Sequence, residues 1–577
     1  MSSKTPQFDA AIEKILGELT PHERVCRQCQ KSFPVEPDDI DWYKLFRVPP
    51  PTLCPTCRMQ RRMAWRATFL PVFYRRQCNA PGHSEQILSF YSPSNSLVVY
   101  DDSFYYGDGW EGGQFAQEHE PAKPFFEQFD TLAHRAPRQA LGKDPKSVNC
   151  EYVVSGVQAK NCYYCSIPFL SEDIQYSYIP DRSKNSIDTN WLLNSDRCYQ
   201  CTLVEESYNC NFCTDSQNCV DSWFLFDCKN CTNCFGCTNL RNKKYCWFNE
   251  QLTREEYMKR LAEINTGDHT ILRQYQQQFE ELRGKAIRKA IDALHTETSS
   301  GNVLRHTKNA KHCFQIMTGE NLKYVEHVDH IDTIMDLFGS TGSSMAYEVS
   351  GLSHSQNVKF SVMLRTCNDA EYSTECNSCS YIFGCVGLKN KKFCIFNKQY
   401  QEDEYWRRVD ELKTAMLARG EYGEFFPAAD SPCSYKDSNA QTEFPLSKEE
   451  IVSRGWRIDE EPEAVVTPTG PDVLSGDEIP ADIATVTDEI LQQILICAKT
   501  GKPFRLTKFE LDFYRQKKLP LPTVHPLERI KERFKLQRPY RLWDAACSKC
   551  SRAMKSGYDP AEQLTVYCEQ CYQQAVL

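Results

Sequence analysis

The chain has 577 residues and a formal net charge of −9, so it is too long for one small core and is not a polyanion binder by overall charge. Its N-terminal segment lacks the apolar core of a secretory signal, and no stretch reaches the roughly 20 apolar residues of a membrane span. We therefore expect a cytoplasmic protein. Its 30 cysteines are then thiols or metal ligands rather than disulfides.

Residues 1–145 are predicted to form a zinc-finger module. Cys26 and Cys29 form one CxxC pair, and Cys54 and Cys57 form a second. Two such pairs suit one tetrahedral Zn²⁺ with four thiolate ligands. Because the thiolates fill every position, no place remains for a catalytic water, and the predicted site is structural. The second pair runs directly into a helix-like segment, as in a treble-clef finger.

Basic residues follow the second CxxC pair and suggest a nucleic-acid surface. They are Arg58, Arg61, Arg62, Arg66, Arg75 and Arg76, with aromatic residues interleaved. Guanidinium groups bind phosphates and aromatic rings stack on bases, which favours RNA or DNA as a partner. A solvated helix face, or Arg stems packed on aromatic rings, is the plainer interpretation, and both remain open.

Two cysteine-rich stretches, 146–250 and 301–400, show a step of nine residues. The first carries Cys201, Cys210, Cys219, Cys228, Cys237 and Cys246, and the second carries Cys367, Cys376, Cys385 and Cys394. In the second stretch the step extends backward through Leu322, Ile331, Val349 and Val358, which cannot ligate a metal. A recurring small or apolar slot predicts a mainly β fold, a β-solenoid of nonapeptide repeats with cysteines as a core ladder. Metal or iron–sulfur binding by these cysteines is the alternative.

The two stretches end alike, which indicates an internal duplication. Residues 235–249 read FGCTNLRNKKYCWFN and residues 383–397 read FGCVGLKNKKFCIFN. Residues 251–300 form a predicted helical insertion, and residues 401–457 a predicted helix followed by an aromatic arm. An acidic, Pro-rich linker is predicted at 458–489.

Residues 490–577 repeat the N-terminal module with the metal ligands redistributed. A complete four-cysteine finger is formed by Cys547, Cys550, Cys568 and Cys571. The preceding finger keeps Cys497, but Thr500, His525 and Glu528 stand in the places of Cys29, Cys54 and Cys57. Whether Cys497, His525 and Glu528 hold a metal remains open. The N-terminal counterpart of the complete finger keeps Cys78 and offers His83, and metal binding there also remains open.

The chain resembles a family of large cysteine-rich proteins of uncultured small-genome (candidate phyla) bacteria. The resemblance lies in the CxxC…PPPTLCPxCRxQRR opening, the Asn- and Cys-rich middle, the FGC…NKK…FN motif and the GEFFP arm. These motifs cover most of the chain. The resemblance implies the same zinc-ribbon and β-repeat modules and supplies no activity or catalytic residue.

Three functions are compatible with these patterns. The first is a non-enzymatic scaffold with two structural Zn²⁺ ions and a protein partner on the solenoid surface. The second is nucleic-acid binding through the basic helices of the fingers, Arg58–Arg66 and Arg529–Arg541. The third is a carboxylate-based hydrolase of glycans, for which His327 and His330 lie near Asp329 and Asp332. No nucleotide-binding, serine-hydrolase or zinc-protease motif is present, so a non-enzyme is expected and the oligomeric state is open.

Overall fold

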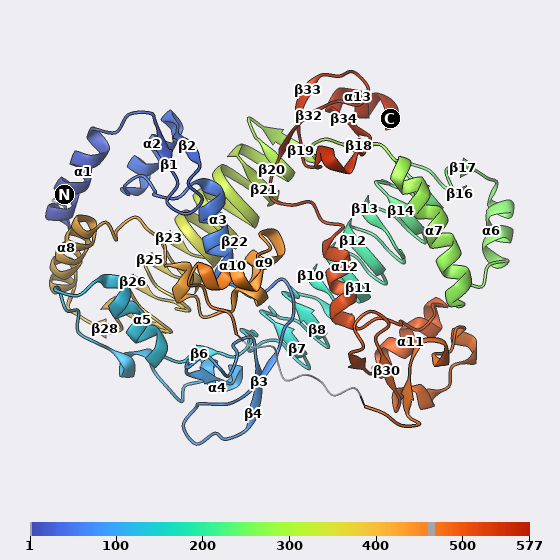
Figure 1. Cartoon of the computed structure of the whole chain (residues 1–577), viewed down its shortest axis with the longest axis horizontal. Coiled ribbons are helices and arrows are strands. Elements are labelled where there is room, and N and C mark those ends of the chain that lie inside the picture. Colours follow the sequence, from blue (N-terminus) through green and yellow to red (C-terminus); the bar gives the residue numbers. More distant parts are fainter. Residues whose placement is uncertain (1–2, 460–467, 577) are drawn as a thin grey trace. The chain divides into compact units, whose positions relative to one another are not determined.

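The computed structural model describes residues 3–459 and 468–576, and the chain falls into two compact units. Unit 1 comprises residues 1–67, 72–140 and 291–460, and unit 2 comprises residues 68–71, 141–290 and 461–577. The N-terminal module thus belongs with the second cysteine-rich stretch, and the C-terminal module with the first. Both units contain many strands and some helices (Figure 1). The predicted linker at 458–489 lies partly outside the described residues.

Unit 1 surrounds one strand array with short elements. These are α1 Pro6–Gly17, β1 His22–Val25, β2 Ser32–Val35, α2 Pro37–Phe46, α3 Pro55–Ala64, β3 Tyr74–Gln77, β4 Gln86–Ser89, β5 Val99–Tyr100, α4 Asp102–Tyr106, α5 Phe125–Arg135, β6 Arg138–Gln139, α8 Glu402–Arg419, α9 Asn439–Glu443 and α10 Lys448–Ser453. The helix expected after the second stretch is α8. The aromatic arm that follows packs inward, with the Phe426 ring 4.5 Å from that of Phe129 and 6.1 Å from that of Tyr372.

Unit 2 has a matching set of elements. These are α6 Arg254–Ala262, α7 His269–Lys285, β18 Arg288–Lys289, β29 Val473–Leu474, β30 Ile494–Ile496, β31 Pro503–Phe504, α11 Lys508–Lys517, α12 Pro526–Phe534, β32 Trp543–Ala546, β33 Ala553–Ser556, β34 Val566–Tyr567 and α13 Glu569–Val576. Helices α6 and α7 lie in the predicted helical insertion. In the described part of the chain, no helix is both long and apolar enough to cross a membrane.

The first array is an 11-stranded sheet in unit 2. Its strands are β7 Glu151–Val154, β8 Tyr163–Ser166, β9 Glu172–Gln175, β10 Tyr178–Asp181, β11 Lys184–Leu193, β12 Tyr199–Glu205, β13 Thr214–Gln217, β14 Trp223–Phe226, β15 Phe235–Thr238, β16 Cys246–Trp247 and β17 Glu250–Gln251. Pairing is parallel up to β16, and β16 pairs with β17 antiparallel. Strand partners such as Ile187 and Tyr199 are twelve residues apart in the sequence. Ser195 and Ser183, which are joined by a hydrogen bond, have the same separation.

The second array is a 10-stranded sheet in unit 1. Its strands are β19 Ala293–Glu297, β20 Gly301–Lys311, β21 Cys313–Ile316, β22 Gly319–Ser353, β23 Gln356–Lys359, β24 Val362–Arg365, β25 Asn368–Glu371, β26 Ser380–Phe383, β27 Lys392–Ile395 and β28 Lys398–Gln399. Parallel pairing again ends in one antiparallel pair, β27 with β28. The repeated FGC segments lie at these two equivalent ends.

The register corrects the predicted nine-residue unit. Positive φ angles recur at every third residue, as at Asn209 and Phe212, so each straight segment is only three residues long. The residue after most of these positions is buried, as Cys210 and Cys213 are. The nine-residue step instead joins residues that share a hydrogen bond. For example, the Cys210 thiol donates to the carbonyl oxygen of Cys219, 3.3 Å away. The cysteines therefore form a buried core, as expected. Residues twelve apart are strand partners, and residues nine apart are joined by thiol-to-carbonyl hydrogen bonds.

Serine occupies the same buried positions as cysteine. The Ser195 hydroxyl donates to the Leu193 carbonyl oxygen (2.7 Å) and accepts from the amide of Ser207 (3.0 Å). A buried amide without a partner is costly, and a small side chain with a hydroxyl supplies the acceptor at this corner. The slot thus accepts cysteine and serine as well as apolar residues such as Leu192 and Val204, and the two small residues add a hydrogen bond to the corner.

This equivalence makes a prediction for Cys219, which is fully buried. Its thiol donates to the carbonyl oxygens of Gln217 (3.4 Å) and Cys228 (3.6 Å), and a serine hydroxyl can make the same two bonds. We expect Cys219→Ser to leave thermal unfolding nearly unchanged and Cys219→Leu to destabilise by about 1–3 kcal/mol through overpacking. Thermal denaturation of the full chain measures both. A larger loss for serine than for leucine would contradict the equivalence.

Candidate metal centres

The first four-cysteine group lies where the β1–β2 hairpin meets the start of α3. Its ligand sulfurs, those of Cys26, Cys29, Cys54 and Cys57, all lie within 4.8 Å of one another. In the hairpin turn, the amide of Cys26 donates to the Lys31 carbonyl oxygen (2.9 Å), and Gln30 has a φ of 60°. Cys54 caps α3 and Cys57 lies in its first turn. Free amides and the helix dipole at that end stabilise thiolates.

The second group repeats this construction in unit 2. Its sulfurs, those of Cys547, Cys550, Cys568 and Cys571, also lie within 4.8 Å of one another. The first two lie in the β32–β33 hairpin turn, where the Cys547 amide donates to the Arg552 carbonyl oxygen (2.9 Å), and the last two at the start of α13. Burial opposes ionisation of Cys547, but amides of Cys568, Cys550 and Lys549 hold its pKa at about 6. A thiolate ready for a cation is thus favoured.

Both groups offer four sulfur donors and can hold a metal ion. Four soft thiolates this close together suit Zn²⁺, and such closed sites serve structure rather than catalysis. The eight predicted ligands are brought together in these two sets. The cysteines of the two arrays join no metal-binding group among the described residues.

The degenerate finger around Cys497 keeps the backbone of an intact one. The Cys497 amide donates to the Lys502 carbonyl oxygen (2.9 Å), as the Cys26 amide does to that of Lys31. His525 caps α12 through its Nδ1, which accepts from the Leu527 amide (3.1 Å). Burial, aided by Arg529, lowers the pKa of His525 to about 4. Within the described ranges, Cys497 and His525 belong to no three-ligand group.

A cluster of acidic residues at the start of α2 is paired with a lysine side chain. Glu36, Asp38 and Asp39 cluster closely enough to ligate a metal. The fully buried ammonium of Lys323 lies 2.7 Å from Asp39 and 2.9 Å from Asp38. Its charge offsets that of the carboxylates, so this cluster is an anchor between α2 and the second array.

The basic residues of α3 are buried, which corrects the predicted nucleic-acid surface. Arg58, Arg61 and Arg62 are 1%, 7% and 0% exposed. Asp336 of the second array accepts from Arg58 Nε (2.8 Å) and from Arg62 Nη1 (3.0 Å). Arg61 reaches Glu348 (3.2 Å) and a second carboxylate on the aromatic arm. The guanidinium groups that the sequence predicted to bind phosphates therefore pair with carboxylates that lie far away in the sequence.

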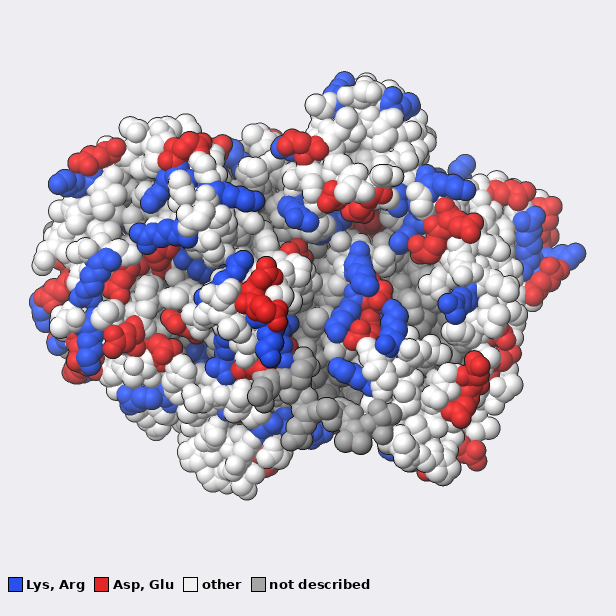
Figure 2. Space-filling model, in the orientation of Figure 1, with Lys and Arg blue, Asp and Glu red and all other residues white. Residues whose placement is uncertain are grey.

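The other three arginines do not restore that surface. Arg76 is buried and donates to the Leu97 carbonyl oxygen (2.7 Å). Arg66 is half-buried with its guanidinium over the Phe338 ring, and only Arg75 is exposed. On the face shown in Figure 2, Lys and Arg are interspersed with Asp and Glu rather than gathered into one patch.

Unit 2 contains an equivalent of the α3 cluster. Arg529 and Arg533, one helical turn apart on α12, both donate to Asp188 of the first array, with Arg533 at 2.9 Å. Arg529 also pairs with the buried Glu510 at 3.2 Å. Asp188 and Asp336 have φ angles of 59° and 58° and hold equivalent places before the FGC segments. The shared RxxxR spacing and the paired aspartates are the signal that sequence analysis missed.

The histidines considered for hydrolysis do not form a catalytic cluster. His330 is exposed and pairs with its neighbour Asp329 (2.8 Å). Asp332 accepts instead from the Asn321 side chain (3.0 Å). Burial and Arg66 lower the pKa of His327 to about 3, so this imidazole is neutral at physiological pH. These pairs lie along successive strand segments and converge on no common point among the described residues.

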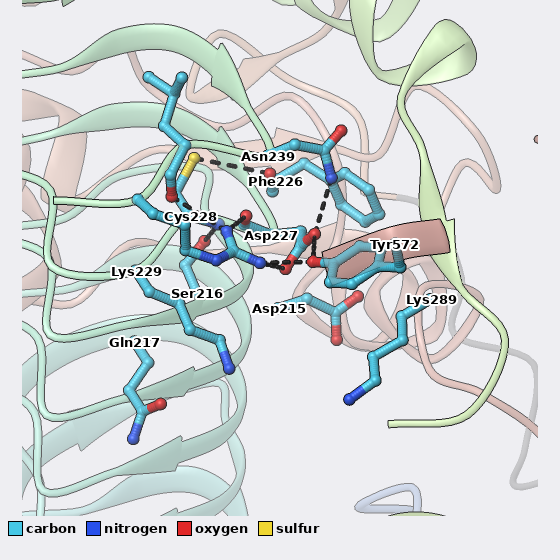
Figure 3. Close-up of polar contacts among 12 residues, drawn as sticks. Asp215, Ser216, Gln217, Phe226, Asp227, Cys228, Lys229, Asn239, Lys289 and Tyr572 are labelled. Atoms are coloured by element: carbon cyan, nitrogen blue, oxygen red, sulfur yellow. Dashed lines mark hydrogen bonds and ion pairs between the residues drawn. The ribbon is translucent and has the colours of Figure 1, made fainter. Parts of the chain in front are cut away.

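The four-cysteine module of unit 2 contacts the first array through a residue next to its cysteines. Tyr572 follows Cys571 on α13, and its hydroxyl donates to the Asp227 carboxylate (Figure 3). The same carboxylate accepts from Asn239 (2.7 Å) and from Arg241 (2.8 Å). Strand β34 of the finger also pairs in parallel with β18. The position of α13 therefore links the cysteine cluster to the array.

A scan against protein-family models finds no match for the chain, and a search of curated proteins finds no similar sequence.

Proposed function

We propose that the protein is a non-enzymatic scaffold that holds two structural Zn²⁺ ions, one in each unit. The observation that carries this proposal is the pair of four-cysteine groups, each built from a hairpin turn and a helix start. Four thiolates leave a bound ion no open position for water or substrate, so the ion serves to hold backbone segments together. Zinc is the metal whose tetrahedral preference and ligand choice these groups fit best.

We also propose that the two arrays are narrow β-solenoids of twelve residues per coil. The parallel register with a twelve-residue step and the positive φ at every third residue support this. Stacked coils expose long parallel rows of side chains, a surface that suits an extended protein partner. Partly exposed ladders such as Asn149–Asn161–Asp173, joined by hydrogen bonds of 2.9 Å, give that surface a regular polar spacing.

In this proposal the zinc ions fix the terminal modules on the solenoids. Cys568 and Cys571 hold the start of α13, and Tyr572 in the next position binds Asp227 of the first array. In unit 1, Cys54 and Cys57 start α3, whose next residue, Arg58, enters the buried cluster around Asp336. Each metal centre thus lies one residue away from an anchor to an array. A reducing, cytoplasmic location keeps such thiolates available for metal.

The other functions expected from the sequence gain less support. Nucleic-acid binding is less supported because the arginines of α3 and α12 that it would use are buried. The glycan-hydrolase hypothesis is less supported because His327, His330, Asp329 and Asp332 do not form one cluster in the described part of the chain. The resemblance to cysteine-rich proteins of small-genome bacteria rests on motifs alone and stays a prediction.

Metal analysis of the purified full chain tests the scaffold proposal. After brief treatment with EDTA we expect two retained Zn²⁺ per chain, and one per chain in Cys57→Ser and in Cys571→Ser, because each variant opens one of the two closed tetrahedral sites. Cys219→Ser is the matched control, since it changes an array cysteine that belongs to neither group, and it should retain two. Iron with visible absorbance, or a zinc content that ignores both ligand variants, would refute the proposal.

A further inference from the structure

We propose that unit 1 contains a third metal site, formed by Cys78, His83 and Glu85, which binds a divalent transition metal of the zinc class with one exchangeable position. The site lies on the β3–β4 hairpin, away from the four-cysteine group of the same unit. It goes beyond the scaffold proposal, because three protein ligands leave room for a water or another small ligand on the metal.

The three donor atoms converge on one point. The Cys78 sulfur, a ring nitrogen of His83 and a carboxylate oxygen of Glu85 all lie within 4.8 Å of one another. His83 Nδ1 is 2.7 Å from Glu85 Oε1. The hairpin turn brings them together, since the Cys78 amide donates to the Glu85 carbonyl oxygen (3.0 Å) and Gly82 adopts a φ of 80°. Sulfur, imidazole and carboxylate are the three donor types that zinc uses in proteins.

An internal comparison shows that the surroundings are those of a metal site. Cys78 follows β3 as Cys547 follows β32, and both sulfurs accept an amide from the start of the next helix. Asp101 donates to Cys78 at 3.4 Å, and Cys568 donates to Cys547 at 3.3 Å. Strand β5 pairs in parallel with β6, as β34 pairs with β18 in the complete finger. The backbone that presents the sulfur is thus the same in both places.

The ligands, however, have been exchanged rather than simply lost. Asp101 stands where Cys568 would stand and uses its carboxylate to cap α4, accepting from the Ser103 amide at 2.9 Å. Phe104 stands where Cys571 would stand and packs its ring 4.9 Å from that of His83. The longer hairpin turn supplies His83 and Glu85 as replacements from one side. With three protein donors in place of four, one coordination position is left for water or another small ligand.

Exposure of the ligands fits an accessible site. Cys78 is 2% exposed, whereas the side chains of His83 and Glu85 are 34% and 50% exposed. A metal held there would reach solvent, unlike one enclosed by four thiolates. The competing interpretation is a surface ion pair of His83 and Glu85 beside an inert core thiol, and it predicts no metal binding.

Cobalt substitution of the full chain distinguishes the two. The zinc-loaded protein is treated briefly with EDTA to empty the exchangeable site while the closed four-cysteine sites keep their zinc, and is then titrated with Co²⁺ without oxygen. We expect one Co²⁺ per chain, with one thiolate charge-transfer band and d–d bands of four- or five-coordination. Cys78→Ser should abolish the charge-transfer band, and His83→Ala and Glu85→Gln should each weaken Co²⁺ binding about tenfold or more.

His354→Ala, a change at an exposed histidine of the second array, is the control and should bind Co²⁺ as the parent does. The proposal is overturned if no Co²⁺ binds to the zinc-retaining chain, or if binding survives Cys78→Ser, His83→Ala and Glu85→Gln unchanged. Because Glu85 is half-exposed, its variant keeps the test valid should Cys78→Ser fail to fold. A chain with two retained zinc ions and no cobalt refutes only this site, whereas a chain without zinc refutes the scaffold.

Discussion

Replacement of Asp336 by asparagine is expected to destabilise unit 1 by about 3–5 kcal/mol, because it leaves buried arginines without their main counter-ion. Asp336 is fully buried and accepts from Arg58 (2.8 Å) and Arg62 (3.0 Å). Asparagine has nearly the same shape and tolerates the φ of 58° at this position, so the change removes charge and little else. The remaining carboxylates, Glu326 and Glu348, have pKa values raised by burial and compensate poorly.

Denaturant unfolding of the full chain, followed by hydrogen exchange on α3, measures this loss. Asp188→Asn should have the same effect on α12 in unit 2, because Arg529 and Arg533 lose their shared partner. Asp369→Asn is the matched control, a half-exposed aspartate with a similar φ of 51° that accepts from Asn357. A loss for Asp336→Asn no larger than that of the control would show that these ion pairs do not hold α3 to the array.

The metal centres could be predicted from the sequence because their signal is local. CxxC spacing fixes two sulfurs on one turn, and the two pairs of each group lie on one module. The backbone of the degenerate finger was also predictable, since CAKTGKPF lies over CRQCQKSF and the Cys497 and Cys26 amides make the same bond. The three-ligand group at Cys78 was visible only in part, because Glu85 has no counterpart in the complete finger.

The period of the arrays could not be read correctly from the cysteines. Nine and twelve are both multiples of the three-residue segment, so both steps fit the same pattern of buried positions. The cysteines recur every nine residues, and at this spacing a thiol donates to the carbonyl oxygen of the next cysteine. Serine holds the same slot with the same bonds, as Ser195 does, so counting cysteines alone hides the true register. The positive φ angles at residues such as Phe212 and Trp191 give no sequence signal, because aromatic residues rarely adopt them.

The fate of the α3 arginines depends on contacts far along the chain. Asp336 and Glu348, which pair with Arg62, lie in the second array, and the sequence around Arg62 does not indicate these partners. A run of arginines without acidic neighbours therefore resembles a phosphate-binding helix until its tertiary partners are known. The duplicated RxxxR spacing in α3 and α12, together with the aspartates before each FGC segment, was the clue to a buried anchor.

If the proposed Zn²⁺ is bound, its removal by a strong chelator is expected to unfold the C-terminal finger and release α13 from the first array. Metal binding in small zinc fingers contributes about 10–16 kcal/mol to folding, and a hairpin with one short helix has little core to replace it. Among the described residues, the partly buried hydrophobic side chains packed against the cluster of Cys547, Cys568 and Cys571 are Met554 and Tyr567. Hydrogen exchange should therefore rise across β34 and α13, while the buried amides of β11 stay protected.

Helix α12 provides the internal control for this experiment. It starts at His525 in the degenerate finger, and its place is held by Asp188 and by a core that includes Leu511 and Tyr514 rather than by thiolates. Exchange in α12 should not respond to the chelator. A rise in α12 equal to that in α13 would mean that the metal supports the whole of unit 2, whereas no rise in α13 would mean that Tyr572 and Asp227 hold the helix without zinc. If α13 is released and α12 is not, the metal holds the finger on the array and the array does not need the metal to stay folded.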